Sequence, residues 1–246
     1  MSTRSDEAYA ILEQIFENFP NVRAADIPGI DLYMDQVTTF LQDSLQSISR
    51  DPEGDKFLTK TMINNYVKNK VLPPPVKKKY SRDQMMLLII IYYMKSFLSI
   101  NDIRSITSPV IEYCSPGAFA DKKREATDKR RENADRKRDA VDRKRGQDEQ
   151  HTAENTRTAG HDRDGTGPDG MEFSRLYDRV MTDIEEMLPK IHEEIMEQIN
   201  RTEKEFEEID REDRVILQHF SLICRLSAEV YVRKLLIEKL LDEHTV

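Results

Sequence analysis

The sequence predicts an all-α or nearly all-α protein, in which a minor β wing is the one departure from helix. The chain has 246 residues, of which 34% are charged and only 8 are glycine, and it is rich in Glu, Lys, Arg, Leu and Ile, which favour helices. Apolar residues recur at helical spacing between residues 9 and 114 and again between 173 and 241. The sequences G-x-G-x-x-G and G-x-x-x-x-G-K-S/T do not occur, which argues against the phosphate-loop and dinucleotide folds.

The N-terminal part of the chain is predicted to begin with two amphipathic helices. Residues 1–24 carry the first, which ends before Pro20 and has the apolar stripe Tyr9, Ile11, Leu12, Ile15, Phe16 and Phe19. Residues 30–34 form a short extended piece after the Pro28-Gly29 turn. Asp35 is the expected N-cap of the second helix, which continues through Leu45.

Two further helices are marked by their capping residues. Thr59 is expected to open a helix of about ten residues, which must end before the prolines at 73–75 because proline disfavours helix in the residue before it. Ser81 and Gln84 fit the capping box of a helix at 82–97.

The apolar run from Met85 to Met94 is much shorter than the roughly 20 residues of a membrane helix, so it is interpreted as a core helix. Ser99 and Asp102 then mark the start of a short helix. Ser108-Pro109 is expected to end that helix or to begin a further turn.

A charged heptapeptide repeat separates the two ends of the chain. The copies DKKREAT, DKRRENA, DRKRDAV and DRKR span residues 121–145. Their weakly apolar residues are adjacent, so the repeat lacks the spaced apolar seam of a coiled coil. Residues 115–170 are therefore interpreted as a linker, largely disordered or a solvated helix. An arm that grips nucleic acid is the alternative.

Residues 171–246 are predicted to form a helical hairpin or bundle. Pro189 is expected to kink or split its first helix, whose stripe is Phe173, Leu176, Tyr177, Val180, Ile184, Met187, Leu188, Ile191, Ile195 and Ile199. From Val215 to Leu241 the chain is apolar on more than one face, so that helix must be buried on several sides. We expect it to pack on the N-terminal part or on a second copy of itself.

Positive charge is concentrated in one stretch of an acidic protein. The net charge is −8, and the segments 1–117, 118–170 and 171–246 carry −1, +1 and −8. Residues 56–82 nevertheless contain eight basic residues and no Asp or Glu. A site for nucleic acid is therefore sought there.

A helical wheel of residues 60–68 separates two faces. Met62, Ile63 and Tyr66 form an apolar face. The opposite face offers side chains that read base edges, and the candidate base contacts are Lys60, Thr61, Asn64, Asn65 and Lys68. The basic run then continues, with the candidate phosphate contacts Lys77, Lys78, Lys79 and Arg82. A solvated helix face followed by a basic loop is the alternative interpretation.

These residues also carry a resemblance. The order Tyr66-x-x-x-Lys-Val-Leu-Pro-Pro, Lys78-x-Tyr80 and Leu98-Ser99-Ile100-x-x-Ile103 resembles the winged helix-turn-helix of MerR-type regulators. The whole chain is similar to an uncharacterised Gram-positive bacterial family known as a domain of unknown function, over roughly 25–114 and 171–244. The resemblance implies that residues 59–69 are the recognition helix and that Lys77 to Tyr80 form the wing.

The sequence departs from the MerR pattern at three points. Asn64 stands where MerR-type proteins usually have Arg, and Lys70 stands where they have the turn glycine. The wing between Pro74 and Tyr80 is about four residues short. DNA binding is therefore expected without the DNA distortion typical of MerR-type proteins.

The sequence thus predicts a cytoplasmic transcriptional regulator that binds double-stranded DNA. Residues 25–114 would form the MerR-like helix-turn-helix domain, and residues 171–246 would serve for homodimerisation or for sensing an effector. A dimer would suit a two-fold symmetric DNA site. The alternative is a non-enzymatic protein-interaction adaptor that keeps the helix-turn-helix shape without DNA binding.

No catalytic, metal or cofactor site is predicted, and neither is an enzyme or a membrane protein. No H-E-x-x-H, C-x-x-C or G-x-S-x-G occurs. His192 beside Glu193 and Glu194, and the Glu-rich run 203–208, are interpreted as solvated surface. Cys114 and Cys224 are too few for a disulfide scaffold, which fits a reducing cytosolic setting.

Overall fold

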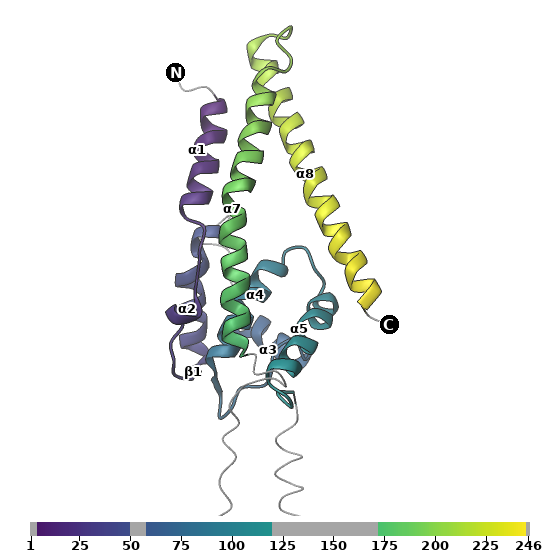
Figure 1. Cartoon of the computed structure of the whole chain (residues 1–246). Helices are drawn as coiled ribbons and strands as arrows, with labels where there is room; N and C mark the ends of the chain where they lie inside the picture. Colours follow the sequence, from purple (N-terminus) through teal and green to yellow (C-terminus); the bar gives the residue numbers. More distant parts are fainter. Residues whose placement is uncertain (1–3, 50–57, 120–171, 245–246) are drawn as a thin grey trace, which may run out of the picture.

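The computed structural model describes residues 4–49, 58–119 and 172–244 (Figure 1). The described residues are mostly helical and carry one small antiparallel sheet, which confirms the mainly α class. The elements in chain order are α1 (Arg4–Glu17), η1 (Ala24–Asp26), β1 (Leu32–Tyr33), α2 (Met34–Leu45), η2 (Gln46–Ile48), α3 (Lys60–Lys68), β2 (Lys79–Tyr80), α4 (Arg82–Met94), α5 (Ile100–Cys114), α7 (Phe173–Glu203) and α8 (Arg211–His244). The repeat at 121–145 lies outside the described residues.

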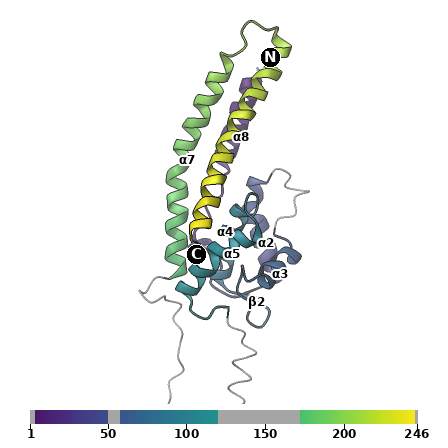
Figure 2. The same cartoon turned by 90° about the vertical axis from the view of Figure 1, so that its right-hand side faces the viewer.

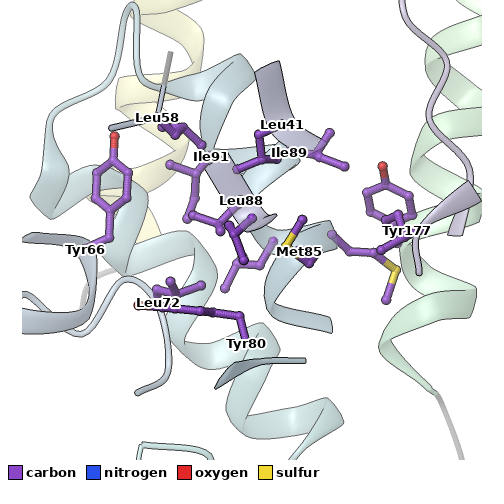
Figure 3. Packing of buried hydrophobic residues seen from close by; sticks show 14 of the residues in the cluster. Leu41, Leu58, Tyr66, Leu72, Tyr80, Met85, Leu88, Ile89, Ile91 and Tyr177 are labelled. Atoms are coloured by element: carbon purple, nitrogen blue, oxygen red, sulfur yellow. The ribbon is translucent and has the colours of Figure 1, made fainter. Parts of the chain in front are cut away.

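Helix α4 is the centre of the hydrophobic core, as the apolar run of the sequence predicts. Residues 84–89 and Ile91 are buried around its whole circumference. Figure 3 shows its side chains between Tyr66, Leu58 and Leu72 on one side and Leu41 and Tyr177 on the other. Because every face of α4 is covered, the surrounding helices are fixed relative to one another.

The predicted capping residues begin three of these helices. Thr59 Oγ1 accepts a hydrogen bond from the Met62 amide at 3.2 Å. Ser81 and Gln84 form a reciprocal capping box, in which the Ser81 amide donates to Gln84 Oε1 at 2.8 Å. Ser99 and Asp102 form the same arrangement at the start of α5. These caps satisfy backbone amides that have no partner within the helix.

Three predicted helix boundaries are wrong. Tyr33 rather than Asp35 is the N-cap of α2, because strand β1 runs directly into the helix and Asp35 falls in its first turn. Helix α5 continues through Pro109 to Cys114. Helix α7 continues through Pro189 as one element of 31 residues, so Pro189 does not split it. In both α5 and α7 packing along the helix outweighs the backbone hydrogen bond that a proline removes.

The first turns of α7 belong to the same core as the helices around α4. Phe173, Tyr177 and Met181 are at most 5% exposed and join that cluster. The Tyr177 hydroxyl donates to the Val22 carbonyl at 2.6 Å, and the Ala24 amide donates to Asp178 Oδ1 at 2.8 Å. A division of the chain between residues 114 and 171 therefore cuts through one hydrophobic core.

Helix α1 packs along α7 further up the same helix (Figure 1). Leu12 is buried, while Ile11 and Ile15 are exposed. His192 Nε2 lies 2.9 Å from Glu13 Oε1, and the His192 ring meets Phe16 edge-on. The interpretation of His192 as solvated helix surface is therefore wrong, because α1 covers it.

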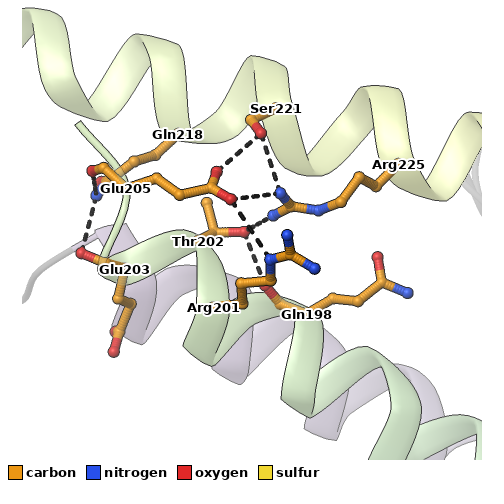
Figure 4. A network of polar contacts seen from close by, with 8 residues as sticks. All are labelled: Gln198, Arg201, Thr202, Glu203, Glu205, Gln218, Ser221 and Arg225. Atoms are coloured by element: carbon orange, nitrogen blue, oxygen red, sulfur yellow. Dashed lines mark hydrogen bonds and ion pairs between the residues drawn. The ribbon is translucent and has the colours of Figure 1, made fainter.

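A polar network closes the turn between α7 and α8 (Figure 4). Ser221 Oγ donates to one carboxylate oxygen of Glu205 at 2.9 Å, and Arg225 Nη1 donates to the other at 2.7 Å. The Arg225 guanidinium also donates to Thr202 Oγ1. The hydrogen bond from Ser221 and the bonds and charge of Arg225 lower the pKa of Glu205 against the effect of desolvation. The Glu205 side chain is 26% exposed, which corrects its interpretation as solvated surface.

Helix α8 contacts α7 and α5 but leaves much apolar surface uncovered. Its side chains that are 41–67% exposed are Ile216, Phe220, Ile223, Val230, Tyr231, Val232, Leu235, Leu236 and Leu240. By length and composition alone, its segment Glu212–Glu243 could also cross a membrane. The expected burial on several sides is therefore not achieved within one copy of the described chain.

Candidate nucleic-acid interface

Helix α3 presents the two faces that the helical wheel predicts. Ile63 and Tyr66 are buried in the core, and Met62 packs against it. The five candidate base contacts are all exposed on the other face: Lys60, Thr61, Asn64, Asn65 and Lys68. The apolar face thus anchors the helix, and the polar face is open to a ligand.

Two of these side chains have partners within the protein. Lys60 forms an ion pair with the exposed carboxylate of Asp35 on α2. The Asn69 amide group donates to Asn65 Oδ1 at 2.9 Å, which orients the Asn65 side chain. The Asn65 amide nitrogen remains a donor that faces away from the core, whereas the Lys60 charge is partly neutralised.

The turn after α3 has a backbone conformation that favours glycine. Lys70 has a φ of 58°, and the amides of Lys70 and Val71 donate to the carbonyls of Val67 and Tyr66 at 3.2 and 2.9 Å. This pair of bonds is a Schellman motif, whose left-handed position is usually glycine. Lys70 therefore stands at a position where the backbone must be left-handed.

Side chains from α4 and α5 fix the segment that follows. Ser108 Oγ donates to the Lys70 carbonyl at 3.0 Å, and Gln84 Nε2 donates to the Pro73 carbonyl at 2.7 Å. Thr107 is buried with its hydroxyl 3.4 Å from the Val71 carbonyl. These contacts hold α3 and the wing in one geometry. The sequence predicted Gln84 as a capping residue but not its contact with Pro73. No sequence signal marks Thr107 or Ser108, because their contacts are with residues 36 and 38 positions away.

A short β-hairpin forms the wing. Val76 and Lys79 exchange backbone hydrogen bonds of 3.0 Å, and Lys77 and Lys78 make the two-residue turn between them with φ of 52° and 66°. Positive φ at both central residues is the geometry of a type I′ turn, for which Asn-Gly is the preferred sequence. Both lysines are exposed at its tip.

The wing is attached to the start of α2 through the two-stranded sheet. Leu32 pairs with Tyr80 and Tyr33 with Lys79 in antiparallel register. The Lys79 ammonium lies 4.9 Å from the centre of the Tyr33 ring. In Figure 2, α3 and β2 lie on the side of the molecule away from α7. The polar face of α3 and the wing are thus carried by one rigid part of the fold, apart from the acidic C-terminal helices.

The structure gives Arg82 a different partner from the predicted phosphate. Its guanidinium Nε donates to the Ala24 carbonyl at 2.9 Å, and the side chain is half-buried. Arg82 therefore connects α4 to the segment that docks on α7. Of the other predicted phosphate contacts, Lys77 and Lys78 are exposed, and Lys79 is half-buried beside the Tyr33 ring.

Burial also shifts the pKa of two groups on α4 and α5. Cys114 is fully buried, and burial followed by the charge of Asp83 raises the pKa of its thiol. Burial raises the pKa of Asp83 as well, with a smaller opposing effect of Arg82 and a smaller reinforcing effect of Glu172. Among residues 4–49, 58–119 and 172–244, no group of three His, Cys, Asp or Glu side chains is placed to hold a metal ion.

Comparison with known proteins adds one finding. Neither curated proteins nor solved structures give a match. A family match is found for residues 22–125, which contain β1, α2, α3, the wing, α4 and α5, the elements that build the candidate interface. The matching family is described as a domain of unknown function, DUF1836.

Proposed function

We propose that the protein is a transcriptional regulator in the cytoplasm that binds double-stranded DNA through α3 and the wing. On this proposal residues 25–114 are a winged helix-turn-helix related to that of MerR-type regulators. Support comes from the order of elements: a strand, α2, α3 and a β-hairpin that pairs with that strand. Further support comes from α3, whose amide and ammonium side chains are exposed while its apolar face is buried.

The observation that carries the proposal is the use of lysine where the backbone favours another residue. Lys70, Lys77 and Lys78 all have φ between 52° and 66°, and all three are exposed. A left-handed conformation costs a non-glycine residue about 1–2 kcal/mol. Strain of this kind is often kept for function. Three exposed cations kept at this cost beside α3 favour a polyanionic ligand.

We assign base reading to Thr61, Asn64, Asn65 and Lys68, and phosphate contacts to Lys70, Lys77, Lys78 and Lys79. Asn side chains pair with adenine in the major groove, and lysines bind guanine or phosphate. Lys60 is a weaker base contact because Asp35 competes for its charge. Contact with about four phosphates predicts a log–log salt slope of about −4.

The proposal is tested by capturing sheared DNA from the source organism at about 150 mM salt, near physiological ionic strength. Sequencing should reveal a shared short motif, and fluorescence anisotropy then measures affinity for that motif as salt is varied. We expect Asn64→Ala with Asn65→Ala to remove the preference for the motif. Lys78→Ala should weaken binding to all sequences and reduce the salt slope by about 1.

Lys190→Ala on α7 is the matched control, since it removes the same exposed charge far from the interface. It should leave affinity and slope unchanged. If the wild-type protein retains no DNA even at low salt, the proposal is wrong. A non-enzymatic protein-interaction adaptor would then be the better interpretation.

A further inference from the structure

Helix α8 carries an apolar stripe on the side that faces away from α7. The outer stripe consists of Ile216, Phe220, Ile223, Ser227, Val230, Tyr231 and Leu235, all of which are exposed. Successive members are separated by three or four residues, apart from the adjacent pair Val230 and Tyr231. At 100° per residue they occupy an arc of about 140°. A stripe of this spacing is what one helix presents to another.

The opposite face of α8 is already used within the chain. Arg225 is bonded to Glu205 and Thr202, and Gln198 Nε2 donates to Glu229 Oε1 at 2.5 Å. These are the two charged residues within the apolar stretch from Val215 to Val232. Insertion of α8 into a bilayer would break both sets of contacts and expose their charges to lipid. The contacts therefore favour a helix that stays packed on α7 and offers the outer stripe to a protein.

We propose that the outer stripe of α8 pairs with the same stripe of a second copy of this chain. The six apolar side chains of the stripe are 41–67% exposed, which corresponds to about 600 Å² of apolar surface on each copy. That area is close to the roughly 800 Å² per partner of a stable protein interface. A second copy supplies an equal stripe with the same spacing, and a two-fold axis brings the two together.

The charges along α8 limit the pairing to its N-terminal two-thirds. From Ile216 to Tyr231, no charged residue falls within the arc of the stripe. Beyond Tyr231, Lys234 falls in the same arc and forms an i,i+4 ion pair with Glu238 at 3.1 Å, and Arg233 reaches Glu194 on α7. Ser227 is the polar residue at the centre of the stripe, where a hydroxyl limits affinity and helps to define register.

The test measures molecular mass by sedimentation velocity without DNA, over about 1 to 100 μM protein. The outcome is therefore independent of the proposed DNA binding. The wild-type chain should be a dimer, and Phe220→Asp should be a monomer with unchanged helicity. Ile15→Asp on α1 is the matched control, because Ile15 is also an exposed apolar residue (49%, against 67% for Phe220) and the change in charge is the same. It should remain a dimer.

A second variant acts in the opposite direction. Ser227→Leu replaces the central hydroxyl with an apolar side chain and should strengthen the dimer at least tenfold. A wild-type chain that is monomeric throughout the concentration range would overturn the proposal. The same holds if Phe220→Asp leaves the mass unchanged. Co-sedimentation of the wild-type chain with vesicles of neutral phospholipid, lost in Phe220→Asp, would assign the stripe to a membrane and also overturn the proposal.

Discussion

At three positions a lysine side chain supplies a positive charge at a cost in local stability: Lys70, Lys77 and Lys78. Each is held at positive φ by backbone hydrogen bonds, Lys70 in the helix end and the other two in the hairpin turn. Glycine would relieve the steric conflict between the side chain and the backbone at each position. It would also remove a cation from the candidate interface. Fold stability and ligand binding should therefore respond in opposite directions at these residues.

The first prediction concerns Lys70→Gly. We expect the free energy of unfolding to rise by about 0.5–1 kcal/mol, since the relief of strain exceeds the added entropy of the unfolded chain. DNA affinity should fall. Urea denaturation followed by circular dichroism measures the first effect, and anisotropy measures the second. Lys68→Gly is the contrasting variant: because Lys68 has ordinary helical backbone, glycine there should destabilise the protein.

The exposed and buried faces of α3 were predictable from the sequence, whereas the contacts of Arg82 with distant parts of the chain were not. The wheel of residues 60–68 correctly separated exposed from buried side chains because helical periodicity is a local property. The resemblance correctly marked Lys70 as a special backbone position. Arg82 was assigned to phosphate on its charge alone. Its actual partner is the Ala24 carbonyl, 58 positions away, and sequence alone gives no measure of such a contact.

At the scale of elements, the turn between α7 and α8 depends on one carboxylate. Glu205 accepts hydrogen bonds from Ser221 and Arg225 of α8, so its ionised form is stabilised in the folded protein. The composition of 203–208 gave no indication of this. The segment contains four glutamates, and composition does not distinguish the one that contacts Ser221 and Arg225. Composition describes a segment, but burial is decided residue by residue by the packing of the next helix.

The second prediction concerns Glu205→Gln. The folded pKa of Glu205 lies below its ordinary value of 4.5, so this carboxylate adds stability above that pH and the contribution is lost as pH falls through the folded pKa. We expect the variant to be less stable than wild type at pH 7, with the difference shrinking in acid. Thermal melts from neutral to acidic pH measure this. Glu208→Gln, exposed on the same turn, should melt like wild type at every pH.

At the scale of the whole molecule, the segment that matches a domain of unknown function does not contain its complete core. Phe173, Tyr177 and Met181 of α7 lie beyond residue 125 but are buried in the cluster around α4. Arg23 extends this contact by donating to the Asp178 carbonyl and to Thr182 Oγ1. Helical periodicity predicted the stripe of α7, but it could not identify which surface covers that stripe.

The third prediction follows for Tyr177, which is fully buried. Tyr177→Ala should lower the free energy of unfolding by about 3–5 kcal/mol, as for other large aromatic side chains removed from a core. Urea unfolding should remain a single transition, because α7 and the helices around α4 share that core. Tyr177→Phe keeps the ring and removes only the hydrogen bond to Val22, so its cost should be about 1 kcal/mol. Two separate transitions would show that the cores are independent.

The positions of Cys114 and Glu172 have a consequence for the length of the chain between them. The charge of Asp83 acts on Cys114, and the charge of Glu172 acts on Asp83, so the end of α5 and the start of α7 lie close together (Figure 1). The chain therefore leaves α5 and returns to α7 at nearby points, with the 52 residues from 120 to 171 between them. Closing a loop costs entropy that rises slowly with its length.

The fourth prediction is that a Gly-Ser linker about a quarter as long would stabilise the fold by about 1 kcal/mol. Urea denaturation of the shortened chain measures this change, and a loss of stability would contradict it. In evolutionary terms, the same geometry makes this point of the fold a permissive one. Adding or removing copies of the seven-residue repeat would change the free energy of unfolding only in proportion to the logarithm of the segment length.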